Sequence, residues 1–598
     1  MLIEFKNNFR GYFTFYYKII GNRIFAYLVL SILVSLLDGI GLAMFMPLFS
    51  AMSKDDSVSA DDSTMGGLQF ITDGIQALGI SLNITTVLCV LGLLFTFKGV
   101  CKFIQLNFQV DLRYQFIRTV RTLLIENLTK LSYPGFLKLE SGRVHNTLTS
   151  EVTKVFTSMN FYFLALQNAV MLLTYIGLAF LANAQFAILV AIGGVLSNLL
   201  YKKIYTATKQ ISIKLSANGV KFTSYMIQAI HNFKYLKSTN YFSRYSEKLK
   251  DVMHENEVLN KRVGFYNAIS LSAKEPMIMI IVAGVIQIQI SVIGTSLGAI
   301  LLSLMFFYRA LNFLVIIQNN WQSFVQNTGG MMSVTSTLND MYDMREEITD
   351  VPPPTIQRAL KIKDVDFSYG ETKILDKINL EMPRNQTIAL VGESGSGKTT
   401  LANLISGLIS PDRGEITIDQ VPLNNYDLNA FRSRIGYISQ DAVVFNDSIY
   451  NNITFWAEPS EENKKRFWEV VELTSLTSFI STQPEKEQTR LGNNGILISG
   501  GQKQRISIAR ELYKKAEILI LDEATSALDS ETEKIIQENI EKLHGTYTMV
   551  IIAHRLSTIK NADIIYLLEK GKVTASGSFD TMLEVSERFK RMVNLQEI

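Results

Sequence analysis

The chain has 598 residues, too many for a single hydrophobic core, so we expect at least two domains. Hydrophobic residues make up 47% of it and charged residues 19%, which fits a chain that is part membrane and part water-exposed. The net charge of +3 gives no support for nucleic-acid binding. The cysteines, Cys89 and Cys101, lie twelve positions apart in one apolar stretch, so neither a disulfide framework nor a zinc site is expected.

Aromatic and basic residues alternate at the start of the chain, for example Phe5 with Lys6 and Tyr17 with Lys18. No small-residue cleavage site follows them, so we expect a helix at the membrane interface over residues 1–22 rather than a signal peptide. An extended beginning of the first membrane span is the alternative.

Six apolar segments are each long enough to cross a bilayer, which takes about 20 helical residues. They cover residues 24–49, 84–105, 162–182, 184–204, 268–290 and 296–318. With their connections they predict an all-α membrane domain of six helices over residues 23–345.

The connections between these spans differ in charge. Residues 53–83 contain five aspartates and one lysine, whereas residues 106–160 are rich in arginine and lysine. The positive-inside rule therefore places the basic connection and both termini in the cytoplasm. We expect the two long polar connections, 106–160 and 205–266, to continue the spans as helices.

Three prolines at positions 352–354 predict an extended linker over residues 346–357, because consecutive prolines prevent a helix. Beyond it, strand-like and helical segments alternate without another apolar span. We expect an α/β domain over residues 358–598.

A glycine-rich phosphate-binding loop follows the strand predicted for residues 387–391. It consists of Gly392, Glu393, Ser394, Gly395, Ser396, Gly397, Lys398, Thr399 and Thr400. Its backbone N–H groups can face phosphate oxygens, while Lys398 reaches the β- and γ-phosphates and Thr399 offers its hydroxyl to Mg²⁺. A helix predicted from Thr400 to Leu408 would point its N-terminus at the phosphates. The loop predicts a nucleoside triphosphatase.

A second buried strand, predicted for residues 518–523, ends in two adjacent carboxylates. Asp522 is placed to hold Mg²⁺ through water, and Glu523 to polarise the attacking water. We therefore predict that Glu523 is the general base.

About a hundred residues after the loop, a short peptide resembles the signature peptide of the ATP-binding-cassette family. It contains Ile498, Ser499, Gly500, Gly501 and Gln502. In that family the signature peptide of one copy completes the nucleotide site of another. The resemblance implies an exporter, with an all-α six-helix transmembrane domain followed by an α/β P-loop ATPase domain that hydrolyses ATP with Mg²⁺ to drive transport.

Four further positions match that family's nucleotide site. Tyr369 would stack on adenine, Gln440 would lie near Mg²⁺, and His554 would sense the γ-phosphate. Asp529 would complete the nucleotide contacts. Ile498 stands where the family usually has leucine, and Asn493 where exporters usually have an acidic residue, which bears on coupling to the membrane domain.

One chain with one loop and one signature peptide must pair with another chain. Because two-fold symmetry completes both sites through one interface, we expect a homodimer. A heterodimer with a related chain is the alternative.

Charged residues inside the spans are candidates for function because they are costly to bury in lipid. They are Asp38, Lys98, Lys102, Lys274, Glu275 and Arg309. Lys98, Lys274 and Arg309 share one depth, roughly 20 to 25 Å from the external ends at 1.5 Å per residue. These cations suit an anion with several oxygens, such as a diphosphate. Alternatively, Lys98 and Lys102 extend to the cytoplasmic headgroups and Lys274 pairs with a carboxylate.

This layout resembles the bacterial flippases of lipid-linked oligosaccharides that serve protein N-glycosylation. Lys98 and Arg309 stand at matching places, and Asp38 fits the first span of that family. The resemblance implies transfer of a polyprenyl-diphosphate-linked oligosaccharide from the inner to the outer leaflet of the bacterial inner membrane, with the ATPase domain in the cytoplasm. Export of amphipathic drugs, peptides or another lipid such as lipid A is the alternative.

Overall fold

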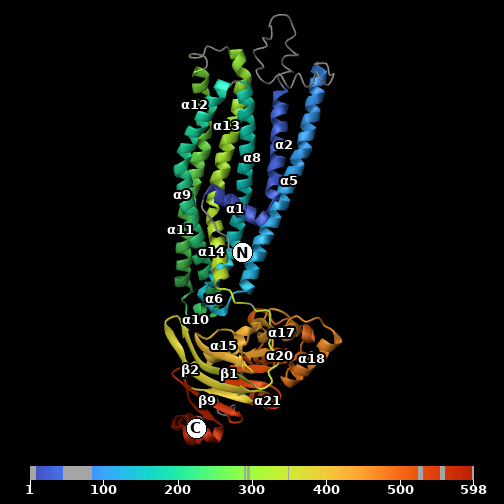
Figure 1. Ribbon diagram of the computed structural model, residues 1–598, viewed down its shortest axis with the longest axis vertical. Coiled ribbons are helices and arrows are strands. Elements are labelled where there is room, and N and C mark those ends of the chain that lie inside the picture. Colours follow the sequence, from blue (N-terminus) through green and yellow to red (C-terminus); the bar gives the residue numbers. More distant parts are fainter. Residues whose placement is uncertain are drawn as a thin grey trace. The chain divides into compact units, whose positions relative to one another are not determined.

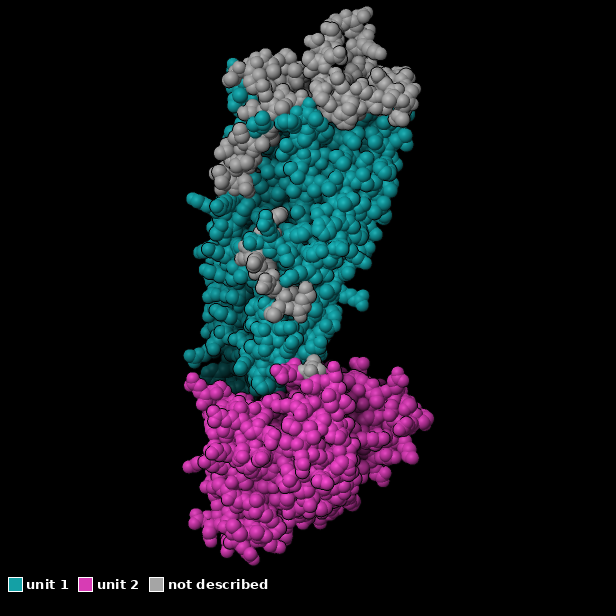
Figure 2. All heavy atoms as spheres, viewed as in Figure 1, with its two compact units in different colours: residues 1–345 teal, residues 346–598 magenta. Residues whose placement is uncertain are grey.

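The computed structural model describes residues 8–44, 84–182, 184–288, 291, 297–347, 349–522, 530–552 and 559–595. The chain divides into two compact units, residues 1–345 and 346–598, which Figure 2 colours separately. Three predicted site residues, Glu523, Asp529 and His554, lie outside the described residues, and so does the side chain of Lys274.

Unit 1 is a bundle of long helices (Figure 1). Its first elements are α1 (Phe9–Ile20), α2 (Arg23–Ala43), α5 (Ile84–Thr129), α6 (Tyr133–Lys138), α7 (Ser141–Asn146) and the π-helical turn η3 (Thr147–Glu151). Then follow α8 (Val152–Ala182), α9 (Ala184–His231), α10 (Phe233–Ser238), α11 (Phe242–Ser272), α12 (Lys274–Ile288), α13 (Leu297–Gln326) and α14 (Thr328–Asp343). Helix α8 packs along α13, and α2 packs against α5 and α8.

Four helical segments among the described residues are long and apolar enough to cross a membrane. They are Arg23–Ala43, Thr85–Thr129, Ser141–Leu181 and Phe242–Ile288. The two other predicted spans, 184–204 and 296–318, fall on α9 and α13. The helices α5 and α9 have 46 and 48 residues, so they extend far beyond a bilayer's thickness, as the polar connections predicted.

The helix expected at the start of the chain is α1, and one of its faces belongs to the core of unit 1. Tyr12 and Tyr16 on this face are buried, and the ring of Tyr16 lies against Phe116 of α5 and Tyr162 of α8. The Tyr16 hydroxyl and the Ser158 hydroxyl are hydrogen-bonded at 2.9 Å. The buried face fixes α1 to the bundle.

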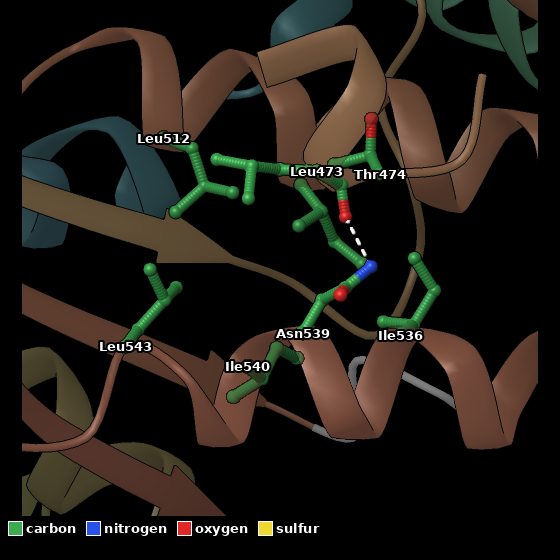
Figure 3. A pocket seen from close by; sticks show the side chains of 8 residues that line it. Leu473, Thr474, Leu512, Ile536, Asn539, Ile540 and Leu543 are labelled. Carbon is green, nitrogen blue, oxygen red and sulfur yellow. Dashed lines mark hydrogen bonds between the residues drawn. The ribbon is translucent and has the colours of Figure 1, made fainter. Parts of the chain in front are cut away.

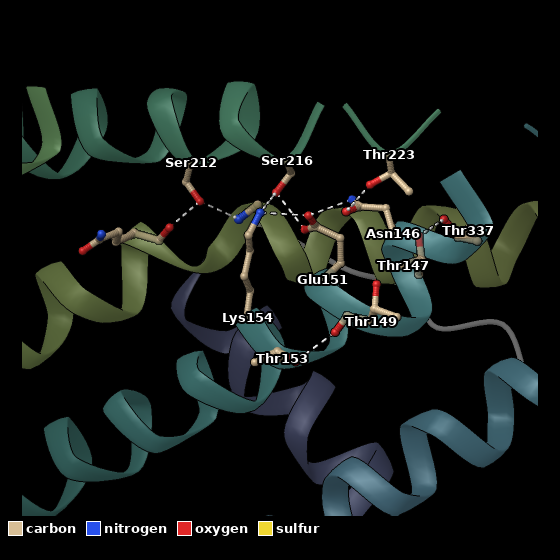
Figure 4. A network of polar contacts seen from close by, with 12 residues as sticks. Asn146, Thr147, Thr149, Glu151, Thr153, Lys154, Ser212, Ser216, Thr223 and Thr337 are labelled. Atoms are coloured by element: carbon tan, nitrogen blue, oxygen red, sulfur yellow. Dashed lines mark hydrogen bonds and ion pairs between the residues drawn. The ribbon is translucent and has the colours of Figure 1, made fainter. Parts of the chain in front are cut away.

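A buried polar network joins η3 to α9 (Figure 4). The Glu151 carboxylate accepts hydrogen bonds from Asn146 Nδ2 at 3.1 Å, Ser216 Oγ at 2.8 Å and Lys154 Nζ at 2.8 Å. On α9, the Ser212 hydroxyl connects to the junction of α13 and α14. A buried charge must be paired and hydrogen-bonded. This network therefore fixes how η3, α9 and the junction of α13 and α14 meet.

The described residues of unit 2 form two sheets. The antiparallel sheet has the order β2-β1-β4-β5, from β1 (Ala359–Tyr369), β2 (Thr372–Pro383), β4 (Arg413–Ile418) and β5 (Val421–Pro422). The other has the order β10-β9-β3-β8-β7-β6, from β3 (Thr387–Val391), β6 (Ile435–Ile438), β7 (Ile518–Asp522), β8 (Thr548–Ile552), β9 (Ile564–Glu569) and β10 (Lys572–Gly577). In it only β10 runs antiparallel to its neighbour.

Helices surround these sheets (Figure 1). They are α15 (Lys398–Ile405), α16 (Leu428–Arg432), α17 (Ile449–Thr454), α18 (Glu461–Leu473), α19 (Thr477–Ser481), α20 (Gly500–Tyr513), α21 (Ser530–Glu541), α23 (Phe579–Val585) and α24 (Glu587–Asn594). A cavity of about 10 Å³ is lined by residues of α18, α20 and α21 and by Thr474 and Leu543, which follow α18 and α21. Figure 3 shows its lining, where Asn539 Nδ2 donates to the Leu473 carbonyl. The cavity has room for about one water and belongs to the core.

The strand predicted for residues 387–391 is β3, and the one predicted for 518–523 is β7, which ends at Asp522, the last described residue before Glu523. All ten residues of β3 and β7 are buried. Both run parallel to β8, with Leu390 and Asp522 each level with Ile552. Because carboxyl ends of parallel strands share one sheet edge, the loop after β3 and the carboxylate of Asp522 lie at the same edge. The helix predicted from Thr400 to Leu408 begins earlier, at Lys398, and ends at Ile405.

Candidate functional site

The loop after β3 is shaped by glycines in conformations that other residues rarely adopt. Gly392, Gly395 and Gly397 have φ of 156°, 80° and 103°. A Cβ atom on Gly392 would lie 2.2 Å from the Leu568 carbonyl oxygen, and one on Gly397 would lie 2.6 Å from a methyl group of Leu375. Neither position tolerates a side chain, so the backbone itself forms the surface of the loop.

Lys398 is folded over this loop. It is the first residue of α15, it is buried, and its Nζ donates to the carbonyls of Gly392 at 2.8 Å and Glu393 at 2.9 Å. The buried hydroxyl of Ser396 has no hydrogen-bond partner among the described residues. A cation, an unpaired hydroxyl and a helix N-terminus gathered in one loop fit a phosphate group.

The other loop residues face outward to different degrees. Glu393, Ser394, Gly395 and Thr399 are exposed, whereas Thr400 is half-buried. The exposed hydroxyl of Thr399 is therefore accessible to a bound ion.

Two predicted Mg²⁺ ligands lie at the same edge of the sheet. Asp522 is buried at the end of β7, where the Tyr437 hydroxyl donates to its Oδ2 at 3.4 Å. Gln440 is exposed two residues after β6, the strand that pairs with β7. A carboxylate, an amide oxygen and the hydroxyl of Thr399 are the hard oxygen ligands that Mg²⁺ prefers, so these residues fit the ion.

Tyr369 ends β1 with 39% of its surface exposed, and its ring meets Phe367 edge-to-face at 4.9 Å between centroids. The ring is held by a neighbour and leaves a face in solvent, as the predicted stacking on adenine requires.

The signature peptide forms a capped helix N-terminus. The Ser499 hydroxyl accepts from the Gln502 N–H at 3.2 Å, and Gln502 Oε1 accepts from the Ser499 N–H at 2.9 Å. Gly500 is exposed and Gly501 is half-buried in the first turn of α20. This reciprocal capping box satisfies two backbone N–H groups at the start of α20.

In unit 1 three charged residues of the spans, Asp38, Lys98 and Arg309, lie close together on different helices, whereas no contact joins Lys102 or Glu275 to them among the described residues. Lys98 of α5 pairs with the carboxylate of Asp38 in α2, and the Tyr175 hydroxyl of α8 donates to that carboxylate at 2.7 Å. Arg309 of α13 is exposed, acts electrostatically on Asp38, and makes no hydrogen bond or ion pair with the described residues. Neither the pairing of Lys98 with Asp38 nor the contact with Tyr175 was predicted from the sequence. The acidic residue Asp38 in the first span was the one sequence feature that indicated a partner for a span lysine.

The chain matches known families over most of its length. Residues 24–316 match the ABC transporter transmembrane region, and residues 375–526 match the ABC transporter family. The heterocyst differentiation ATP-binding protein HepA of Nostoc sp. is 31% identical over 477 residues, 77% of this chain and 76% of that protein. The chain belongs to the ABC transporters.

Further comparisons describe the kind of transporter. An ATP-dependent lipid A-core flippase of Shewanella denitrificans is 28% identical to this ABC transporter over 583 residues, 95% of each chain. The fold is similar to that of a bacterial Atm1-family ABC exporter with ATP bound, with a TM-score of 0.78 and 22% identity over 97% of this chain and 100% of the other. The protein is a multi-pass membrane exporter whose ABC domain binds ATP and couples its hydrolysis to transport. It has a half-transporter fold, which implies dimerisation.

Proposed function

We propose that this exporter is a homodimeric flippase for an anionic, phosphate-bearing lipid, with a polyprenyl-diphosphate-linked oligosaccharide as its cargo. It moves the lipid from the inner to the outer leaflet of the bacterial inner membrane. The observation that carries this proposal is Arg309, an exposed arginine on a predicted span that forms no ion pair with the described residues.

An unpaired arginine in a span is expensive, at about 2.5 to 3.5 kcal/mol on insertion scales, and therefore marks a functional position. Its planar guanidinium binds phosphate oxygens bidentately, which an ammonium group cannot do. Arg309 thus favours an anionic headgroup over the hydrophobic cations that drug exporters carry.

Lys98 has a different part in this proposal. Its charge is balanced by Asp38, so a phosphate approaching Arg309 would compete with Asp38 for Lys98. Lys274 is the third predicted cation. We retain it as a contact for the anionic headgroup, because its position along the span gives it the same membrane depth as Lys98 and Arg309.

ATP would be held by the phosphate loop, with Tyr369 beside the adenine and the signature peptide, from Ser499 to Gln502, of a second copy closing the site. Thr399, Gln440 and Asp522 would hold Mg²⁺, which neutralises charge on the β- and γ-phosphates when it is bound. Glu523, Asp529 and His554 keep their predicted roles as base, nucleotide contact and γ-phosphate switch.

The test is ATPase activity in nanodiscs with a polyprenyl-diphosphate saccharide, comparing the parent with Arg309→Ala. We expect stimulation of the parent and little stimulation of Arg309→Ala, because the guanidinium binds the diphosphate. Lys102→Ala is the matched control, since Lys102 is an exposed cation one helical turn beyond Lys98. Equal stimulation of parent and Arg309→Ala, or none of the parent, would remove the diphosphate site.

A second cargo is favoured by the relatives named lipid A-core flippase, one of which aligns with 95% of this chain. The same assay separates the two. Stimulation by lipid A-core and not by the polyprenyl-diphosphate saccharide would change the cargo, and stimulation by hydrophobic cations would favour a drug exporter.

A further inference from the structure

The last helix of unit 2, α24, is fixed to the strand that leads into the phosphate loop. Phe589 and Val593 of α24 are buried in one cluster with Ala389 and Val391 of β3. The Phe589 side chain is fully buried, so the neighbouring residue of the helix has a defined position relative to the loop.

That neighbour is Arg588, whose guanidinium bridges two carboxylates. Its Nη2 lies 2.5 Å from Glu393 Oε1, and its Nε lies 2.9 Å from Glu569 Oε1. Glu393 is the second residue of the phosphate loop, and Glu569 ends β9, the strand beside β3. Arg588 therefore ties the loop to the end of the adjacent strand.

Glu393 also organises the loop from within through its main chain. Its carbonyl accepts from Lys398 Nζ at 2.9 Å and from the Ser396 N–H at 3.1 Å. The preceding residue, Gly392, approaches the Leu568 carbonyl, next to Glu569, too closely for a Cβ atom. A displacement of Glu393 would therefore displace Lys398 Nζ and Ser396, the two groups that we expect to contact a phosphate.

The charge of Glu393 matters as well. Its side chain is 72% exposed beside a loop that binds a triphosphate, and an unpaired carboxylate there would repel the nucleotide. The guanidinium of Arg588, which Glu393 shares with Glu569, offsets part of this charge.

We propose that Arg588 is a positioning residue for ATP binding, which acts by holding Glu393 and offsetting the charge of its carboxylate at the rim of the phosphate loop. The C-terminal helix is thereby part of the nucleotide site, although it touches no nucleotide. This inference rests on the ATPase activity of the family and is independent of the transported lipid.

The experiment measures KM for ATP and kcat of the full-length protein in nanodiscs for the parent, Arg588→Ala, Glu393→Gln and the double variant. Arg588→Ala should raise KM about fivefold, the upper end for an exposed ion pair, and change kcat less than about twofold. The increase should shrink in high salt, which screens the freed carboxylate. In the Glu393→Gln background, Arg588→Ala should change KM less than about twofold, because its partner charge is already absent.

Arg591→Ala is the matched control, because Arg591 is an exposed arginine on the same helix without an ion pair to the described residues. It should leave KM unchanged. If Arg588→Ala does not fold, Arg588→Lys replaces it in the experiment. The KM for ATP of Arg588→Lys should rise less than fivefold, because lysine keeps the positive charge but cannot bridge two carboxylates with a planar guanidinium. An unchanged KM for ATP in Arg588→Ala would overturn the proposal. So would an equal increase in KM when Arg588→Ala is made in the parent and in the Glu393→Gln background.

Discussion

The phosphate loop of unit 2 and the charge cluster of unit 1 each bind a lysine, but the groups that bind it differ. Lys398 is bound by carbonyls of its own loop, five and six residues away in the sequence. Lys98 is bound by the carboxylate of Asp38, sixty residues away on another helix. The first arrangement is local and uses the main chain, whereas the second is distant and uses side chains.

This difference explains why the two sites respond differently to sequence change. The loop depends on its glycines, because only they leave the main chain free to bind lysine and phosphate. The membrane cluster depends on matched charges, which other residue pairs on the same helices could replace. The ATPase site is therefore recognisable as a motif, and the cargo site is not.

The largest expected effect tests whether Glu523, which was predicted from the local sequence alone, is the catalytic base. Glu523→Gln should retain ATP binding and lose turnover by more than about a hundredfold, because the amide cannot accept a proton from the attacking water. ATPase assays and nucleotide-binding titrations measure the two properties separately. Brisk hydrolysis by Glu523→Gln would contradict its assignment as the base.

A smaller effect tests whether the membrane cluster is held by paired charges. Asp38→Asn should destabilise the protein, because Lys98 loses its counter-ion, and the loss should be largely relieved when Lys98→Met is added. In a double-mutant cycle, measured by chemical unfolding in mixed micelles, the coupling should be about 1–3 kcal/mol. Tyr175→Phe, which removes one hydrogen bond, should cost about 1 kcal/mol. Additive effects at Asp38 and Lys98 would show that the pair is not coupled.

The smallest effect concerns Asp419, a carboxylate that binds main-chain groups far away in the sequence. It combines the main-chain binding of the phosphate loop with the distant side-chain contact of the membrane cluster. Asp419 accepts hydrogen bonds from the N–H groups of Gln357, Arg358 and Ala359 at 2.7 to 3.0 Å. Burial raises the pKa of its carboxyl, but these N–H groups together lower that pKa below its ordinary value. Asp419→Asn keeps a residue that tolerates the φ of 48° and should cost about 1 kcal/mol at pH 7.

The pH dependence of this loss has a definite sign. Because the pKa of Asp419 is lower in the folded state, its contribution is present above the unfolded pKa of about 4 and disappears as the pH falls through the folded value. The difference between parent and Asp419→Asn should therefore vanish in acid. It is measured on the unfolding transition that ATP shifts, which reports on unit 2. A constant difference across pH would contradict the role of the ionised carboxylate.

The sequence predicted much of unit 2 because its signals are local. Strand β3 has the predicted bounds, and β7 begins where predicted and covers the predicted strand as far as Asp522, the last described residue before Glu523, since short apolar runs followed by glycine or by carboxylates mark both strands. The error at α15 is also local: Gly397, in a left-handed conformation, caps the helix so that it begins at Lys398.

What the sequence could not predict are contacts between distant helices and strands. The pairing of Asp38 with Lys98 and Tyr175 depends on how three helices pack, and the bridge from Arg588 to Glu393 depends on where α24 docks. Neither contact can be predicted from the spacing of apolar and polar residues along the chain. The roles of all the predicted site residues remain predictions; Glu523, Asp529, His554 and the side chain of Lys274 also lie outside the described residues.

The π-helical turn η3 adds one residue to the winding of the chain just before α8. Removing one residue from Thr147–Glu151 would restore ordinary winding and turn the rest of α8 by about 100° about its axis. Tyr175 would then leave Asp38, and a new set of α8 side chains would take its place. A single insertion or deletion near η3 is thus an evolutionary step by which such an exporter could exchange the lining of one helix without altering its ATPase.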